Sequence, residues 1–274
     1  MRIDHLNHLR LAELDLIREY LPPHGCLLEI GAGTGLQGMH LRRLGYELEM
    51  VDLPSSNYAA ERLCAITDYD GRRIPFDDAT FDVVYSSSVL EHVSDLPFLL
   101  AEIRRVLRPT GYAIHVVPTH YWRLWTSLGE FPAAARRAYT LLETLLKQLA
   151  NPPRSSHAVV PDATTTWVAL ARSIARPFAL RRHGERGTAL TELLFFQPAC
   201  WRRIFTANGY RILHEKPARL FYTGATVMGP RWSIAQRRRL SRLLGSATHL
   251  FVVSPQALRQ PRSGDVDLPC DSGR

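Results

Sequence analysis

Leu27–Gly35 reads LLEIGAGTG, and this stretch has the strongest structural pattern in the chain. The apolar run Cys26–Ile30 is short enough to be a buried strand, and alternating glycines follow it immediately. Residues 36–44 then carry apolar side chains at helical spacing. A strand, a tight turn and a helix are therefore predicted. Because glycines lack a β-carbon, a ligand can lie against this turn. The turn amides and the helix N-terminus favour an electron-rich group such as a carboxylate or a ribose.

Two cofactor classes compete for this loop. Gly33–Gly38 fits the spacing G-x-G-x-x-G of nicotinamide enzymes, with Asp52 as the acid that binds the ribose. That match begins two residues late, because Gly31 has already opened the turn. The other pattern, E-x-G-x-G-x-G from Glu29 to Gly35, resembles the first motif of class I S-adenosylmethionine-dependent methyltransferases. Asp52 follows a second predicted strand, where an acid can accept hydrogen bonds from both ribose hydroxyls.

The residues beyond the second strand separate the two classes. Asp70–Asp82 reads DGRRIPFDDATFD. It resembles the methyltransferase pattern in which an Asp binds the adenine amine, an Ile/Leu-Pro-Phe turn follows, and Phe-Asp opens the fourth strand. A nicotinamide enzyme has no reason to carry this segment. An amphipathic helix over 99–107 ends at the stop signals of Arg108–Gly111. The further strands are predicted at residues 46–51, 64–69, 81–85 and 112–117.

Residues 27–118 together resemble the large family of small class I methyltransferases typified by the ubiquinone and menaquinone biosynthesis enzymes. This resemblance implies an α/β fold with a doubly wound, mostly parallel seven-stranded sheet. The strand order of this Rossmann-like methyltransferase fold is 3-2-1-4-5-7-6, and here a helical insertion follows strand five. The implied cofactor is S-adenosyl-L-methionine. The cofactor-binding residues expected from the matching motifs are Glu29, Gly31, Ala32, Gly33, Gly35, Asp52, Leu53, Asp70, Gly71, Ser86 and Ser87.

The insertion is the main departure from the minimal family pattern. It contains helical stretches at residues 133–150 and 167–174 and lies after strand five, at the sheet edge where open α/β folds bind ligands. We therefore expect it to roof the acceptor site. The expected organisation is an N-terminal helix or lid (1–24), a cofactor-binding core (25–118), the insertion (119–190), a closing helix and hairpin (191–256) and a disordered tail (257–274).

Charge is distributed unevenly along the chain. Residues 1–118 carry 11 Lys and Arg against 17 Asp and Glu, residues 119–190 carry 10 against 4, and residues 191–274 carry 13 against 5. A basic second half suits an anionic substrate, a nucleic acid or an acidic membrane surface, and a plain solvated face is equally consistent with it. The apolar face expected from Leu141, Leu142, Leu145, Leu146 and Leu149 suits either membrane contact or packing onto the domain.

Several function classes are disfavoured by what the sequence lacks. Base N-methylating enzymes carry Asn/Asp-Pro-Pro directly after strand four, whereas here three serines follow it and Asn151–Arg154 (NPPR) lies far downstream. No apolar run is long enough to cross a bilayer, and Met1–His5 does not begin a signal peptide, so we expect a cytoplasmic protein. No metal site is expected, because the four cysteines are scattered without pair spacing.

Three histidines are candidates for acid–base chemistry. The sulfonium of the cofactor is already electrophilic, so the protein must mainly align a nucleophile with the methyl group. A hydroxyl acceptor additionally needs a base, which favours histidine near neutral pH. His92 follows strand four and His120 follows strand five, so both are catalytic candidates, although Glu-His-Val is often structural in this family. His183 is a weaker third candidate in the glycine-flanked turn His183–Gly187 (HGERG), which can equally be a surface turn.

The function predicted from these observations is S-adenosylmethionine-dependent methyl transfer (EC 2.1.1 type) to a small-molecule or glycan acceptor. The favoured atom is a hydroxyl, in secondary metabolism or cell-surface saccharide biosynthesis. The alternatives are a methyltransferase acting on RNA or protein, one acting on a lipid-like quinone or phenol at a membrane surface, and a cofactor-binding protein without catalysis. The intact family motifs disfavour the last of these. One sequence does not identify the acceptor or the oligomeric state.

Overall fold

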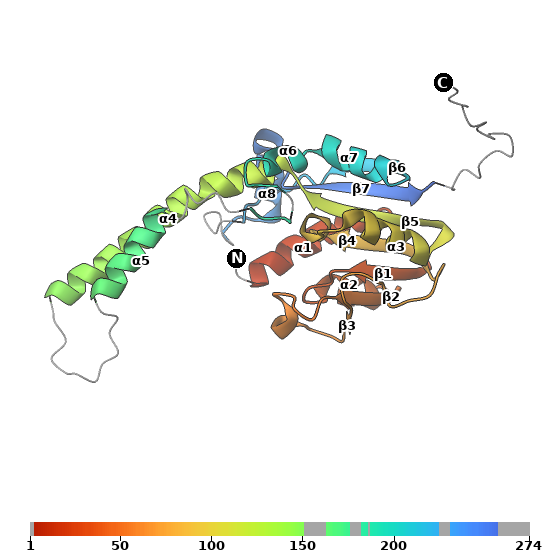
Figure 1. The fold of residues 1–274 in the computed structure, drawn as a ribbon, viewed down its shortest axis with the longest axis horizontal. Coiled ribbons are helices and arrows are strands. Elements are labelled where there is room, and N and C mark those ends of the chain that lie inside the picture. The colour runs from red at the N-terminus through yellow and green to blue at the C-terminus, as the bar shows by residue number, and fades with distance from the viewer. Residues whose placement is uncertain (1–2, 151–162, 176–181, 186, 225–230, 257–274) are drawn as a thin grey trace, which may run out of the picture.

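A computed structural model of the chain describes residues 3–150, 163–175, 182–185, 187–224 and 231–256. Its centre is a seven-stranded sheet of order β3-β2-β1-β4-β5-β7-β6, which confirms the predicted fold (Figure 1). Neighbouring strands are parallel except for β7, which is antiparallel to both β5 and β6. The strands are β1 (Cys26–Ile30), β2 (Glu47–Asp52), β3 (Thr67–Asp68), β4 (Phe81–Ser87), β5 (Leu107–Pro118), β6 (Tyr210–Pro217) and β7 (Thr248–Pro255).

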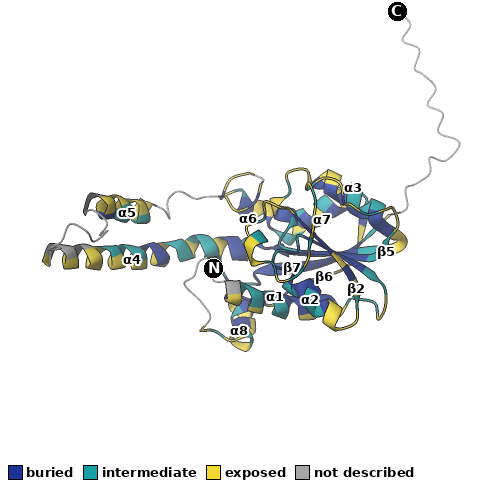
Figure 2. Cartoon of the chain, turned by 90° about the horizontal axis from the view of Figure 1, so that it is seen from below, coloured by how far each residue is buried: buried dark blue, intermediate teal, exposed yellow. Residues whose placement is uncertain are grey.

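Helices cover both faces of this sheet, and each face has its own core (Figure 2). Successive strand residues point to opposite faces, so Leu27 enters one core while Leu28 enters the other. One core includes Leu14 and Leu41, and the other includes Phe205. The helices around the sheet are α1 (Ile3–Arg18), α2 (Leu36–Arg43), α3 (Leu96–Val106), α6 (Glu192–Phe195), α7 (Pro198–Ala207) and α8 (Ile234–Leu244), with 3₁₀ turns η1 (Ala59–Glu61) and η2 (Leu90–His92).

Two strands differ in length from the prediction. β3 pairs with β2 only through Thr67 and Asp68, so most of the predicted 64–69 strand is irregular. β5 begins at Leu107, so the segment Arg108–Gly111, whose Pro and Gly are the predicted stop signals of the preceding helix, belongs to the strand. The pairing with β4 shifts between Phe81↔Leu107 and Val83↔Tyr112, so the ladder is interrupted there. Proline is tolerated at this point because it removes a donor where regular pairing is already broken.

The insertion differs most from expectation. α4 (His120–Ala150) is one continuous 31-residue helix that passes through Pro132. At 1.5 Å per residue it is about 46 Å long, too long to remain above the sheet. α4 and α5 (Ala163–Ala175) lie side by side and project away from the body (Figures 1 and 2). The insertion therefore chiefly forms a projecting pair of helices, and only its ends can cover the acceptor site.

Some predicted features cannot be compared with this structure. Asn151–Arg154, Arg186 and the tail 257–274 lie outside the described residues. Within the described part of the chain, no helix has both the length and the hydropathy needed to cross a membrane.

A buried histidine in β5 makes folding sensitive to acid. His115 is fully buried, its ring stacks on Phe205, and its Nδ1 lies 2.9 Å from the Ser86 hydroxyl. Burial lowers the pKa of His115 to about 3, whereas an unfolded histidine titrates near 6.5. Between these values the unfolded chain binds a proton that the folded chain does not, so acid destabilises the fold through this group.

We expect His115→Asn to remove this contribution. The unfolding free energy of the wild type relative to the variant should fall by about 1.4 kcal/mol per pH unit as pH decreases from 6 to 4. Urea unfolding of both proteins across this range measures the difference, and the titrations of other groups largely cancel. Parallel pH profiles would show that His115 does not carry the effect.

Candidate functional site

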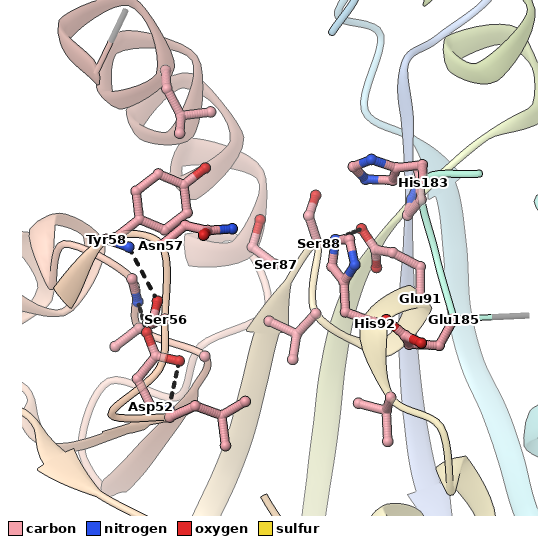
Figure 3. A pocket seen from close by; sticks show the side chains of 18 of the residues that line it. Asp52, Ser56, Asn57, Tyr58, Ser87, Ser88, Glu91, His92, His183 and Glu185 are labelled. Carbon is pink, nitrogen blue, oxygen red and sulfur yellow. Dashed lines mark hydrogen bonds and ion pairs between the residues drawn. The ribbon is translucent and has the colours of Figure 1, made fainter. Parts of the chain in front are cut away.

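A cavity of about 1120 Å³ opens above the carboxyl ends of the central strands (Figure 3). Asp52 and Tyr58 lie on one side of it, and His92 and His183 lie on the other. Ser87 and Ser88, which end β4 and follow it, lie between the two sides. The cavity thus has one half built on β1 and β2 and a second half built on η2 and the insertion.

The glycine loop forms the floor of the first half. Gly31 has a φ of 70°, and a β-carbon there would lie 2.3 Å from Val89, so only glycine fits. Gly33 also has a positive φ, of 57°, and its nearest neighbour is the Tyr58 ring at 3.5 Å from a β-carbon position. The backbone at Gly33 is therefore the part of the loop that a ligand can approach under an aromatic ring.

Asp52 ends β2 directly beside this loop. Its Oδ2 accepts a hydrogen bond from the Gly33 amide at 2.9 Å, and its Oδ1 accepts one from the Leu53 amide at 2.8 Å. The residue is 7% exposed. Since a carboxylate oxygen can accept more than one hydrogen bond, both oxygens retain capacity for a pair of ligand hydroxyls.

Asp70 lies farther along the same half. Its Oδ1 accepts hydrogen bonds from the amides of Arg72 and Arg73, and these bonds lower the pKa of the Asp70 carboxyl. The following Gly71 turns the chain with a φ of 76°. Both amides bond to the same oxygen, so acceptor capacity remains on Oδ2, as binding of an exocyclic amine requires.

Most of the residues predicted to bind the cofactor line the cavity, and three do not. Glu29 is buried below α2, where a β-carbon at Gly38 would lie 2.6 Å from its Oε2, and burial raises its pKa to about 8. Ser86 bonds to His115, and Gly35 precedes α2. The predicted residues that line the cavity are Gly31, Ala32, Gly33, Asp52, Leu53, Asp70, Gly71 and Ser87.

The second half gathers a carboxyl group and two imidazoles. Potential ligand atoms of Glu91, His92 and His183 all lie within 4.8 Å of one another, and the two histidine rings are 4.7 Å apart, edge to face. Glu91 is 4% exposed, and neither of its carboxyl oxygens accepts a hydrogen bond from a described residue. Burial raises the pKa of Glu91 to about 8. Its carboxyl is therefore largely protonated at neutral pH.

Both imidazoles remain neutral near pH 7. Desolvation lowers the pKa of His92, and the negative charge of Glu185 only partly opposes this effect. Desolvation, with the nearby His92 and Arg123, lowers the pKa of His183 to about 3, although its ring is open to the cavity. A neutral imidazole can accept a proton. His92 is therefore in the protonation state that a general base requires.

A buried carboxylate holds His183 at the cavity. Glu192 Oε1 accepts hydrogen bonds from the amides of His183 and Gly184 at 2.6 and 2.7 Å, and Oε2 forms an ion pair with Arg123 Nε at 2.9 Å. The Glu185 amide donates to the Glu91 carbonyl at 2.9 Å. These contacts fix the turn against η2. The sequence pattern leaves this turn open between a surface role and a site role, and two of its described residues, His183 and Glu185, line the cavity.

The structure does not bring His120 to the cavity. Its ring packs on Tyr121 with centroids 4.0 Å apart, and its backbone amide donates to Phe196. Other cavity residues were missed by the sequence interpretation, notably Arg10, Tyr58 and Trp122. Trp122 lies 4.4 Å from the His183 ring. No local motif marks these residues, because each comes from a helix or loop that reaches the cavity only in the folded chain.

Arg10 is held at the cavity by a buried network. Its guanidinium donates to Glu13 Oε2 at 2.7 Å and to the Ser87 hydroxyl at 3.0 Å. Glu13 Oε1 accepts in turn from the hydroxyls of Tyr222 and Thr248 at 2.8 and 2.7 Å. α1 is therefore fastened to β7, and it holds the Arg10 guanidinium, as an ion pair with Glu13, at the edge of the cavity next to Ser87.

In comparison with known proteins, residues 28–115 match the family model described as "Methyltransferase domain". A malonyl-[acyl-carrier protein] O-methyltransferase of Serratia marcescens is 38% identical over 89 residues, which are 31% of this chain and 35% of that protein. A ubiquinone biosynthesis O-methyltransferase of Bradyrhizobium sp. (strain ORS 278) is 31% identical over 153 residues, 52% of this chain and 55% of that protein. The chain thus spans between about a third and about half of the length of these curated relatives.

Solved structures agree on the fold. A complex of the Haloferax volcanii Trm112 methyltransferase activator with a methyltransferase matches with a TM-score of 0.50 and 16% identity, covering 94% of this chain and 92% of that one. An S-adenosylmethionine-dependent methyltransferase from Listeria monocytogenes matches with a TM-score of 0.50 and 14% identity, covering 90% of this chain and all of that one. At this identity the likeness concerns the fold alone.

Proposed function

We propose that this chain, whose residues 28–115 form a class I S-adenosylmethionine-dependent methyltransferase domain, methylates a hydroxyl group of a small-molecule or glycan acceptor. The observation that carries the proposal is the two-sided cavity. Asp52 and the glycine loop line one side, and the neutral His92 lines the other. Both relatives named above are O-methyltransferases, which supports oxygen as the acceptor atom.

The residues of the first half fit S-adenosylmethionine. Asp52 has acceptor capacity on both oxygens for the ribose hydroxyls, and Asp70 has an oxygen suited to the adenine amine. The backbone at Gly33 can lie close to the cofactor, and Arg10, although paired with Glu13, can donate a further N–H to a carboxylate. When bound, the cofactor supplies an activated methyl group. The chain itself positions the acceptor and removes its hydroxyl proton.

The second half suits a polar acceptor. Besides His92 and His183, it is lined by Arg123 and Glu185, while Trp122 offers an aromatic surface. This mixture of polar groups with one aromatic ring favours a hydroxylated, sugar-like molecule over a purely apolar one. We propose that His92 accepts the hydroxyl proton as the methyl group is transferred.

The proposal is tested with S-adenosylmethionine labelled in its methyl group. The purified chain is incubated with fractionated cell extract, and label is followed into glycan and small-molecule, lipid, RNA and protein fractions. Alkali-stable label on a glycan or small molecule is the expected result. Label in RNA or protein, with binding that falls steeply with salt, would favour the alternative that rests on the basic charge of the chain. Absence of label from every fraction would argue for cofactor binding without catalysis.

Asp52→Ala should weaken binding of S-adenosylhomocysteine by about 2 kcal/mol, or roughly 30-fold. The variant removes the acceptor for two ribose hydroxyls and for the amides of Gly33 and Leu53. Isothermal titration calorimetry measures the effect. Asp68→Ala is the matched control, because Asp68 lies on β3 and is exposed. Undiminished affinity in Asp52→Ala, or equal losses in both variants, would remove Asp52 from the ribose site.

A further inference from the structure

The outer face of α4 carries an unbroken apolar stripe. Its members are spaced three or four residues apart, so they share one side of the helix. All are exposed, with Tyr139 at 68% and Leu146 at 58%. The stripe consists of Leu124, Leu128, Phe131, Ala135, Tyr139, Leu142 and Leu146. Soluble proteins rarely leave so long an apolar surface in water unless it binds something.

α5 extends this apolar character. It packs beside α4 and has a single charged residue, Arg172, among its 13 residues. Trp167 is 55% exposed, and Val168 and Ile174 are exposed as well. We call α5 together with residues 124–150 of α4 the arm. Figure 2 shows exposed residues along both of its helices.

The charge of the arm is positive despite its two acids. Glu130 forms an ion pair with Arg137, and Glu143 forms one with Lys147. Arg136 and Arg172 add two exposed positive charges. Basic side chains therefore accompany the apolar stripe, and both acids of the arm are paired with a basic residue.

A basic helix adjoins the root of the arm. The Trp125 indole donates to the carbonyl of Leu244 at the end of α8, and Gly245 packs so tightly on Tyr121 that a β-carbon would lie 2.2 Å from the ring. α8 exposes three arginines and Leu243, which is 85% exposed. The arginines are Arg238, Arg239 and Arg242.

We propose that the arm and α8 dock this protein on the surface of an anionic phospholipid bilayer. Exposed leucines with Trp and Tyr suit the boundary between acyl chains and headgroups, and exposed arginines suit lipid phosphates. This combination of a projecting apolar face, amphipathic aromatic rings and surplus positive charge favours lipid over a second copy of the chain, whose own arm would repel it. The root of α4 also lines the cavity through Trp122, Arg123 and Thr126, so docking would place the acceptor site close to the bilayer.

Vesicle co-sedimentation of the full chain tests the proposal without knowledge of the acceptor. The probes are vesicles of phosphatidylcholine alone and of phosphatidylcholine with phosphatidylglycerol at 3:1, each in 0.1 and 0.5 M salt. We expect binding to the anionic vesicles that weakens in high salt and is much weaker on phosphatidylcholine.

Two triple variants separate the apolar and the electrostatic contributions. Tyr139→Glu/Leu142→Glu/Leu146→Glu should abolish binding to both vesicle types. Arg238→Gln/Arg239→Gln/Arg242→Gln should lower affinity for anionic vesicles about 100-fold and leave the weak binding to phosphatidylcholine unchanged. The matched control is Leu44→Glu/Leu63→Glu/Leu213→Glu, which introduces the same charge at exposed leucines away from the arm and α8. Circular dichroism and S-adenosylhomocysteine affinity check that each variant is folded.

Three outcomes would overturn the proposal. The first is failure of the folded wild type to bind anionic vesicles in 0.1 M salt. The second is equal loss of binding in the arm variant and in the leucine control. The third is a stable dimer in sedimentation equilibrium that the arm variant dissociates, because the stripe would then belong to a second copy of the chain. None of these results depends on methyl transfer, so the docking proposal and the proposed function can fail separately.

Discussion

His92→Ala is expected to lower the rate of methyl transfer by about 10²- to 10⁴-fold while leaving the affinity for S-adenosylmethionine unchanged. His92 lies in the half of the cavity opposite Asp52, so its removal leaves the cofactor contacts intact (Figure 3). Desolvation lowers the pKa of His92, which keeps it neutral and able to accept a proton at pH 7. Wild-type turnover should therefore fall when His92 becomes protonated, at a pH below the ordinary histidine pKa of about 6.5.

The pH dependence of the variant provides a second measurement. The deficit of His92→Ala should shrink as pH rises toward the pKa of the acceptor hydroxyl, because the acceptor then ionises without help. His120→Ala is the matched control, since His120 packs on Tyr121 and does not line the cavity. Equal losses of turnover and of cofactor affinity in His92→Ala would mark His92 as structural. Full activity in His92→Ala with a large loss in His183→Ala would assign the base to His183.

The cofactor half of this cavity could be predicted because its parts are local in sequence. The glycine loop, Asp52 and the turn at Asp70 each follow a strand that the apolar pattern identifies. The carboxyl ends of parallel strands meet at one sheet edge, so their order along the chain is enough to bring these residues together. The motif does not predict which of its side chains line the cavity, as Glu29 shows. It is part of the same motif, yet its side chain lies against Gly38 of α2 and does not line the cavity.

The acceptor half could not be predicted in the same way. His92 was identified from its place after β4, but His120, with an equivalent place after β5, turns away to pack on Tyr121. His120 is the first residue of α4, and its amide donates to the carbonyl of Phe196, a distant residue that no local pattern places there. The sequence pattern predicts a helical stretch only from residue 133, whereas α4 begins at His120 and continues through Pro132. His183 reaches the cavity because Glu192 and Arg123, distant in sequence from each other, pair beneath its turn.

The ion pair between Glu192 and Arg123 predicts a large effect on stability. Glu192→Ala is expected to lower the free energy of unfolding by about 3–5 kcal/mol. Glu192 is fully buried, and its loss would leave the Arg123 guanidinium, itself 5% exposed, without its carboxylate. The amides of His183 and Gly184 would also lose their acceptor. Urea unfolding at pH 7 measures the change, and a loss below about 1 kcal/mol would contradict a stabilising role for this contact.

Two further variants distinguish the charge from the hydrogen bonds. Glu192→Gln keeps an oxygen for the two amides but removes the ion pair, so it should cost less than Glu192→Ala. Arg123→Gln/Glu192→Gln should be more stable than the sum of the single changes predicts, because neither buried charge is then left alone.

The same variants also test the position of His183, since we expect its ring to reach the cavity only while its turn is held against η2. In Glu192→Gln the ring contact between His92 and His183 should loosen, which ¹H–¹⁵N spectra of the two imidazoles would detect as a rise in the pKa of His183 toward its ordinary value near 6.5. An unchanged His183 titration in a destabilised protein would show that Glu192 stabilises the fold without positioning this side chain.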